Sequence, residues 1–204
     1  MIYLFLAPGF EEVEALAPLD LLRRAGEKVT TVAVTTPAGV VATERAVTGS
    51  HHITVIADMS EADFLQHMDA TRTDPAAMPV RAVILPGGMP GAAHLDASPM
   101  VDEALRFAAE QGACLAAICA APMVLGKRGY LKGRRATCFP GFEDKLTGAT
   151  VGGFVVRDES RAGGDFVTVT ARGMGVAQEF GLELVSLLVS PKTAGEIRAA
   201  IQTP

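Results

Sequence analysis

Short apolar runs alternate with amphipathic helical patterns along this chain of 204 residues, and this alternation limits the fold more than any other feature. Strands separated by helices favour a mostly parallel sheet that is covered by helices on both faces. The expected strands are residues 2–7, 28–35, two or three short strands within 39–57, 81–85, 113–118, 134–138, 151–157 and 166–170. The expected helices are 12–25, 60–68, 98–111, one beginning at Pro122, 174–189 and 191–201, and 69–79 is expected to be a loop. No linker divides the chain, which predicts a single α/β domain over residues 1–204.

The composition excludes several classes of protein. A hydrophobic content of 49% with 20% charged residues is typical of a compact folded protein. The net charge of -5 gives no indication of nucleic-acid binding. No apolar run approaches the roughly 18 residues that a membrane span needs. Residues 1–7 lack a basic region and run into acidic residues, so we expect a buried strand there and not a signal peptide.

The three cysteines, Cys114, Cys119 and Cys138, are too few for a disulfide framework. No cysteine and histidine cluster has the spacing of metal ligands, and no nucleotide-binding glycine pattern is present. We therefore expect a cytoplasmic protein without a metal or other cofactor.

The stretch Ala116-Ala-Ile-Cys-Ala-Ala-Pro122 is the strongest candidate for chemistry. An apolar run ends at Cys119, small residues follow, and Pro122 begins a helical pattern. This is the rhythm of a nucleophile elbow, in which a sharp turn exposes the nucleophile at the carboxyl edge of a sheet. The amino end of a helix also favours a thiolate. The alternative is a buried core cysteine, since free cysteines are often buried.

Glu14 is the candidate partner of this thiol. It lies in the first turn of the expected helix 12–25, where Glu11 and Glu12 are explained as acids that complement the helix dipole. Its apolar neighbours predict that Glu14 is semi-buried. A protonated carboxyl there would donate a hydrogen bond to a thiolate.

Gly87 and Gly88 follow the expected strand 81–85 and let the backbone approach a ligand closely. The amides of Gly88 and Ala120 are candidates for an oxyanion hole, and an ordinary tight turn is the alternative. Two further segments are candidate parts of a pocket rim, the pair His51 and His52 between short strands and the loop that contains Arg172. A surface or turn role is the alternative for each of them.

Five motifs in order resemble the ThiJ/PfpI superfamily, and within it the branch that contains the Parkinson-disease protein deglycase and its bacterial relatives. They begin at Phe5 (Phe-Leu-Ala-Pro-Gly-Phe-Glu-Glu-Val-Glu), Leu85 (Leu-Pro-Gly-Gly), Ala116 (Ala-Ala-Ile-Cys-Ala-Ala-Pro), Ala136 (Ala-Thr-Cys-Phe-Pro) and Ala171 (Ala-Arg-Gly-Met-Gly). The resemblance covers roughly residues 1–200. It implies a flavodoxin-like sandwich of the class I glutamine amidotransferase type, a homodimer, and an oxidation-prone nucleophilic cysteine.

The resemblance also implies roles for residues. Cys119 matches the nucleophile, Glu14 matches the acid that hydrogen-bonds its sulfur, and Gly88 and Ala120 match the oxyanion amides. It implies a cysteine-dependent enzyme acting on small reactive carbonyls or glycation adducts, of the deglycase or glyoxalase type. The alternative is a redox sensor or chaperone that works through oxidation of Cys119 to the sulfinic acid.

The chain departs from the family pattern at several positions. Ala120 stands where the peptidase branch has a histidine, which argues against peptidase or amidase activity. Phe139 replaces a histidine of the human-type members and removes a candidate acid or base. His51 stands where an arginine is frequent, so anion binding at the rim is expected to weaken or to depend on pH. Cys138 is a candidate second pocket thiol, with a packed core thiol as the alternative. The expected homodimer contacts are helix 12–25 and the short strands near His51.

Overall fold

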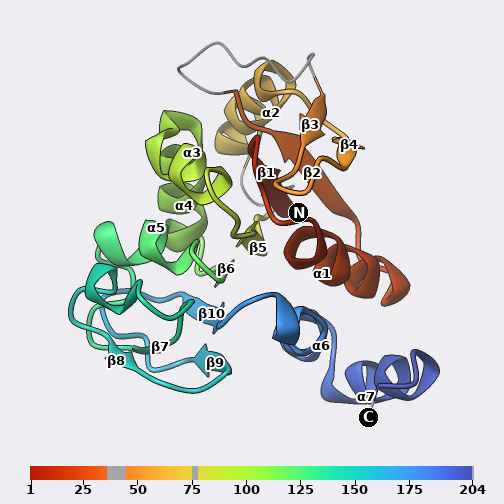
Figure 1. The fold of residues 1–204 in the computed structure, drawn as a ribbon. Helices are drawn as coiled ribbons and strands as arrows, with labels where there is room; N and C mark the ends of the chain where they lie inside the picture. The colour runs from red at the N-terminus through yellow and green to blue at the C-terminus, as the bar shows by residue number, and fades with distance from the viewer. Residues whose placement is uncertain (36–44, 75–77, 204) are drawn as a thin grey trace.

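A mostly parallel sheet forms the centre of the molecule (Figure 1). The computed structural model describes residues 1–35, 45–74 and 78–203, and within them the main sheet has the strand order β2-β1-β5-β6-β10-β9. These strands are β1 Ile2–Leu6, β2 Val29–Ala33, β5 Ala82–Leu85, β6 Cys114–Ile118, β9 Val155–Asp158 and β10 Val167–Ala171. Their pairings are parallel except that of β9 with β10. The predicted fold class is confirmed.

Helices cover both faces of this sheet because its strands are apolar on both sides. Successive side chains of a strand point to opposite faces, so Ile2 and Leu4 of β1 face one layer and Tyr3 and Phe5 face the other. One layer holds α1 Glu12–Arg24, α6 Ala177–Leu188 and α7 Pro191–Ala200. The other holds α2 Glu61–Thr73, α3 Gly91–Ala97, α4 Pro99–Glu110 and α5 Pro122–Lys127. None of the helices in the described ranges is long and apolar enough to cross a membrane.

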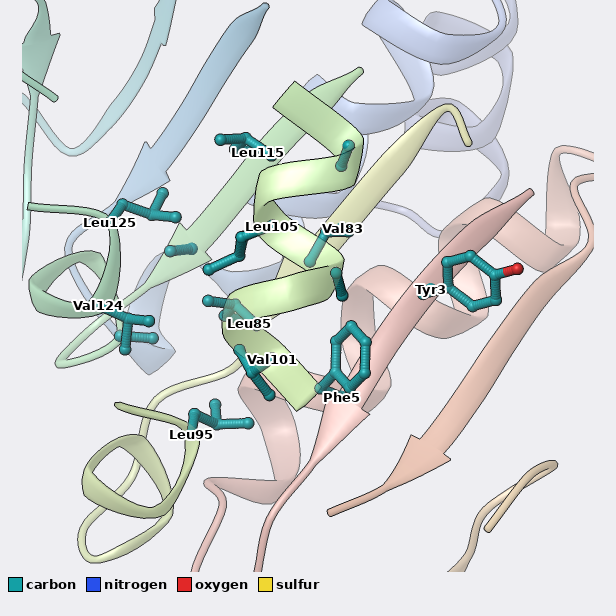
Figure 2. Close-up of a cluster of buried hydrophobic side chains, with 14 of the residues drawn as sticks. Tyr3, Phe5, Val83, Leu85, Leu95, Val101, Leu105, Leu115, Val124 and Leu125 are labelled. Atoms are coloured by element: carbon teal, nitrogen blue, oxygen red, sulfur yellow. The ribbon is translucent and has the colours of Figure 1, made fainter. Parts of the chain in front are cut away.

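Helix α4 packs across the central strands in the second layer (Figure 2). Its Val101 and Leu105 lie against Leu85 of β5 and Leu115 of β6, and all four side chains are fully buried. Burying a side chain of this kind contributes about 1.5–3 kcal/mol. The two strands whose carboxyl ends carry Gly87 and Cys119 are therefore held by apolar packing against α4.

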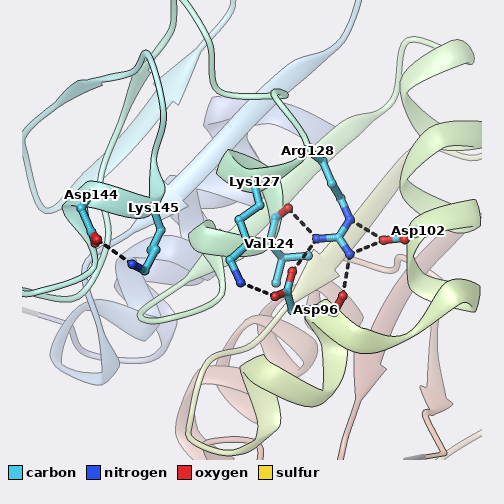
Figure 3. Close-up of polar contacts among 7 residues, drawn as sticks. All are labelled: Asp96, Asp102, Val124, Lys127, Arg128, Asp144 and Lys145. Atoms are coloured by element: carbon cyan, nitrogen blue, oxygen red, sulfur yellow. Dashed lines mark hydrogen bonds and ion pairs between the residues drawn. The ribbon is translucent and has the colours of Figure 1, made fainter.

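Arg128 ties the helix that follows the cysteine to its neighbours (Figure 3). Its guanidinium donates to Oδ1 of Asp96 at 2.7 Å, to the carbonyl of Asp96 at 2.7 Å and to the carbonyl of Val124 at 3.0 Å. It also pairs with Asp102, and Lys127 pairs with Asp96. These contacts join the end of α5 to α3 and α4. Because several donors of one planar group are used, the cluster has a defined geometry.

Two small sheets flank the main one. β3 Ala46–Thr48 and β4 Thr54–Ile56 form an antiparallel hairpin, and β7 Arg135–Ala136 pairs in parallel with β8 Thr150–Val151. The hairpin is bound to the loop after β1, because the Gly9 amide donates to the Thr48 carbonyl at 2.9 Å and the Ser50 amide donates to the Phe10 carbonyl at 2.8 Å. Part of the predicted strand region, residues 39–44, lies outside the described residues.

The structure corrects the predicted boundaries at several points. The predicted loop over 69–79 is wrong at its start, because α2 continues to Thr73 and buries Met68 and Thr71. The helix begins with a capping box between Ser60 and Asp63. Residues 75–77 lie outside the described residues.

Three more corrections concern short elements. Helix α3 was not predicted, because Gly91-Ala-Ala gives no apolar periodicity. The predicted strand over 151–157 is divided between β8 and β9, with Gly152 and Gly153 between them. The segment predicted as a helix over 174–189 begins with a short 3-10 turn, Met174–Val176, before α6.

The chain order of the sheet reverses at β1. From β1 the chain moves to β2 on one side and later to β5 on the other, and ligand sites in open α/β sheets lie outside the carboxyl ends of strands at such a point. The loops after β1, β5, β6 and β10 contain Glu14, Gly87, Cys119 and Arg172 in or beside them. The topology therefore brings every predicted catalytic segment to one edge.

The contact between α1 and α6 allows a test of the first layer. A Cβ added at Gly181 of α6 would lie 2.7 Å from Cδ1 of Leu21 and 2.9 Å from the Cα of Pro18. Because backbone must move, we expect Gly181→Ala to lower the free energy of unfolding by about 1–3 kcal/mol. Urea unfolding followed by circular dichroism measures this change.

Gly195→Ala is the matched control. Gly195 lies in the exposed middle of α7 with nothing within 4 Å of an added Cβ. We expect this variant to gain roughly 0.5–1 kcal/mol through helix propensity. Equal effects of the two substitutions would contradict the tight packing of Gly181 against Pro18 and Leu21.

Candidate active site

Cys119 stands at the turn between β6 and α5 with a φ of +64°. A residue other than glycine in this left-handed region is strained by of order 1–3 kcal/mol and needs support from its surroundings. The support is direct, because the Cys119 amide donates to the Ala171 carbonyl at 2.9 Å and its carbonyl accepts from the Phe139 amide at 2.8 Å. Strand β10 and the segment after β7 thus hold the turn from both sides.

Glu14 reaches this turn from the first turn of α1. Glu14 is only 1% exposed. Its backbone amide donates a hydrogen bond to Oε2 of Glu11 at 2.7 Å, and Glu11 thereby caps the amino end of α1. The Glu14 carboxyl is hydrogen-bonded to the Cys119 thiol and accepts a hydrogen bond from the Met174 amide. It also accepts a hydrogen bond of 3.0 Å from the Gly87 amide. One buried carboxyl therefore connects the loops after β5, β6 and β10.

The two titrating groups influence each other strongly. Burial raises the pKa of Glu14 to about 7. Burial also raises the pKa of Cys119 to about 12, and the negative charge of Glu14 adds to this shift, whereas the amides of Gly88 and Ala120 act in the opposite direction. The negative charge of Glu14 repels a thiolate only while Glu14 is ionised. Protonation of Glu14 therefore removes this repulsion and leaves a hydrogen-bond donor beside the sulfur.

The glycine pair after β5 is required by the close approach of these groups. A Cβ at Gly87 would lie 2.5 Å from Oε2 of Glu14 and 2.6 Å from the Cβ of Cys119. Gly88 has a φ of +86°, and its amide is directed at the sulfur together with that of the buried Ala120. Two amides that converge on one sulfur are positioned to stabilise negative charge formed there.

An apolar cavity of about 500 Å³ opens beside the pair. Its lining consists of apolar, glycine and arginine residues, namely Phe139, Pro140, Phe154, Arg172, Gly173, Met174, Gly175 and Val176. It adjoins the reactive groups through the backbone, since the Phe139 amide binds the Cys119 carbonyl and the Met174 amide binds Glu14. Two predicted pocket residues, Phe139 and Arg172, thus line a cavity at the candidate site.

Two other predicted pocket residues lie elsewhere. His51 is at the turn of the β3–β4 hairpin, where its Nδ1 lies 2.9 Å from Oε2 of Glu12 and its amide donates to Oε1 of Glu12 at 2.7 Å. The hydrogen bond and negative charge of Glu12 raise the pKa of His51. Cys138 is buried in the core, and burial raises the pKa of its thiol to about 11. Neither side chain lines the cavity.

Glu11, Glu12 and His51 place three ligand atoms within 4.8 Å of one another, the spacing of a metal site. The Glu12 oxygens are, however, occupied by hydrogen bonds from the His51 amide and ring. Burial acts to raise the pKa of Glu12, but these hydrogen bonds outweigh burial and lower it. The cluster therefore fastens the hairpin to the start of α1.

Phe154 was missed as a candidate pocket residue. Phe154 follows Gly152 and Gly153 in a segment that the sequence pattern assigned to a strand. The only available signal was an aromatic residue directly after a glycine pair. Met174 belongs to the loop that was expected at the rim.

The residues of this site all lie within a segment that matches a known protein family. Residues 1–187 match the model of the DJ-1/PfpI family. The Parkinson disease protein 7 homolog of Danio rerio is 34% identical over 96% of this chain and 93% of its own length. The glutathione-independent glyoxalase DJR-1.2 of Caenorhabditis elegans is 35% identical over 56% of this chain and 59% of its own length.

Solved structures agree with this match. The oxidized DJ-1 of Toxoplasma gondii superimposes with a TM-score of 0.80 at 30% identity, covering 98% of this chain and 97% of that one. The likeness extends over the central sheet and both helical layers.

The charge coupling predicts the effect of Glu14→Gln on thiol reactivity. The variant removes the negative charge that raises the pKa of Cys119, so more thiolate is present at a given pH. We expect iodoacetamide to alkylate Cys119 at pH 8.5 at least about tenfold faster, which corresponds to one pKa unit. Peptide mass spectrometry separates Cys119 from the two buried cysteines.

Glu110→Gln is the control, because it removes one carboxylate at the exposed end of α4. We expect it to leave the alkylation rate unchanged. Slower alkylation of Glu14→Gln than of the unmodified protein would show that the Glu14 carboxylate favours thiolate formation at Cys119. It would contradict the increase in the Cys119 pKa by the Glu14 charge.

Proposed function

The chain belongs to the DJ-1/PfpI family, and on that premise we propose that it is a cysteine-dependent enzyme that converts small reactive carbonyls. The observation that carries the proposal is the hydrogen bond between the Cys119 thiol and the buried Glu14 carboxyl, with the amides of Gly88 and Ala120 donating to the same sulfur. The relative named a glyoxalase supports the reaction type. Early adducts enter the same reaction once the hemithioacetal or aminocarbinol has expelled its thiol or amine and released the free aldehyde.

The first step forms a bond between sulfur and carbon. The Glu14 carboxylate takes the proton of the Cys119 thiol as the sulfur attacks the aldehyde carbon of an α-oxoaldehyde such as methylglyoxal, and the carbonyl oxygen becomes an oxyanion. The amides of Gly88 and Ala120 stabilise this charge. Glu14, whose pKa of about 7 lies near neutrality, supplies the proton that converts the oxyanion to a hydroxyl.

The second step is an internal transfer that needs no external oxidant. The Glu14 carboxylate removes the proton from the former aldehyde carbon and delivers it to the neighbouring ketone carbon, while the hydroxyl proton of the first carbon passes to the ketone oxygen. The first carbon is thereby oxidised and the second reduced, which leaves a thioester on Cys119. Water then cleaves the thioester, releases a 2-hydroxy acid such as lactate and restores the thiol.

Redox sensing at the same thiol is a second candidate function. Peroxide would convert the thiolate to the sulfenic and then the sulfinic acid, with one peroxide reduced to water at each step. The amides of Gly88 and Ala120 and a protonated Glu14 are donors placed to hold the sulfinate oxygens. The similarity to an oxidized relative supports this alternative.

We also propose a homodimer in the cytoplasm. The faces predicted to meet, α1 and the hairpin near His51, expose the large apolar side chains Val13, Ile53 and Ile56. The free cysteines Cys114, Cys119 and Cys138 favour a reducing compartment. Sedimentation of a monomer at micromolar concentration would contradict the dimer.

Substitution of the two reactive residues tests the enzymatic proposal. We expect Cys119→Ala to abolish the conversion of methylglyoxal to lactate, because the nucleophile is absent. Glu14→Gln is expected to lower kcat by about 100-fold or more, the contribution of a general acid and base, although its thiol is more reactive toward iodoacetamide. Lactate is measured enzymatically in a buffer with a metal chelator.

Cys114→Ala is the matched control, because it removes a buried thiol from the same strand without touching the site. Its activity is expected to remain at the level of the unmodified protein. Full activity of Cys119→Ala would exclude the proposed mechanism. Selective double oxygenation of Cys119 in a protein without carbonyl turnover would favour the sensor.

A further inference from the structure

The cavity beside Cys119 has walls that a three-carbon substrate does not use. Phe139, Phe154 and Met174 line it with side chains that are 48%, 65% and 53% exposed. Large apolar side chains gathered at one concave surface mark a binding site more often than scattered ones do. With about 500 Å³ of volume, the cavity would remain mostly unfilled around methylglyoxal.

The walls stand next to the reacting atoms. The Phe139 amide donates a hydrogen bond to the Cys119 carbonyl, and the Met174 amide donates one to the Glu14 carboxyl. A Cβ at Gly173, between them, would lie 3.3 Å from the Phe139 ring and 4.0 Å from Oε1 of Glu14. A substituent on a carbonyl bound to Cys119 therefore has the apolar walls within reach.

Arg172 adds a cation to this apolar surface. Its guanidinium carbon lies 5.4 Å from the centre of the Phe154 ring. Within residues 1–35, 45–74 and 78–203, no carboxylate forms an ion pair with it. A guanidinium beside an aromatic side chain attracts the face of another aromatic ring. The cavity thus offers two rings, a thioether and a cation, a combination suited to an aryl group.

Resting on the function proposed above, we infer that the preferred substrates are α-oxoaldehydes whose second substituent is aromatic or a bulky apolar group. The aldehyde carbon meets Cys119, and the substituent occupies the cavity between Phe139, Phe154 and Arg172. Phenylglyoxal represents this class, and methylglyoxal represents the small alternative. Specificity then depends on Phe154, which belongs to the pocket wall and takes no part in the chemistry.

The experiment compares kcat/KM for the two carbonyls. We expect the protein to favour phenylglyoxal by at least about tenfold, since even a single methylene in an apolar pocket changes specificity by that order. Initial rates are used, and intact mass confirms that phenylglyoxal has not modified arginines. Equal or higher kcat/KM for methylglyoxal would overturn the inference and leave the proposed function standing.

Substitutions in the cavity wall test whether Phe154 is responsible for the preference for phenylglyoxal over methylglyoxal. Phe154→Ala is expected to lower the ratio of the two kcat/KM values about five- to tenfold, the size of an aromatic contact, and Phe154→Tyr is expected to keep it. Leu65→Ala is the control, because Leu65 is 43% exposed on α2, away from the proposed dimer faces, and does not line the cavity. An unchanged ratio in Phe154→Ala would place the substituent elsewhere.

A binding readout separates this inference from the proposed function. Mandelate, the hydroxy acid that phenylglyoxal would yield, is compared with lactate as a protectant of Cys119 against iodoacetamide. We expect mandelate to protect at a concentration at least about tenfold lower. If neither carbonyl is consumed but mandelate still protects better, the proposed function fails and the aryl pocket stands. Equal protection by both acids would refute the pocket.

Discussion

The left-handed turn at Cys119 is the constraint on which the rest of the site depends. A strained backbone at φ +64° persists only while both of its polar groups are held, by the carbonyl of Ala171 and the amide of Phe139. The second of these bonds also fixes Phe139 at the wall of the cavity. The carboxyl end of β6, which leads into Cys119, is held in place by the main sheet, by helix α4 and by the Arg128 cluster.

Burial of one carboxyl gives this turn its chemistry. In water, Glu14 would be ionised at neutral pH, whereas its burial raises the pKa to about 7 and makes it a proton donor and acceptor in the working range. The same carboxyl fixes the loops after β5 and β10 by accepting the amides of Gly87 and Met174. Structure and reactivity at this site therefore rest on the same hydrogen bonds.

Much of the site could be predicted because its residues have distinctive local demands. A cysteine between an apolar run and a proline, and a glycine pair after a strand, indicate the turns at Cys119 and Gly87 without any tertiary information. His51 and Cys138 show where this reasoning stops. Both are chemically capable side chains, but the hairpin turn binds one of them to Glu12 and the core encloses the other.

The sequence by itself determined the alternation of strands and helices, the family, and the order of the motifs, since these follow from local periodicity and from residue types with narrow uses. Only the tertiary structure decided that Phe139, Phe154 and Met174 share one cavity beside the thiol. These side chains are separated in sequence and belong to loops. Their meeting depends on the pairing of β10 with β6 and β9, a long-range contact that no local pattern encodes.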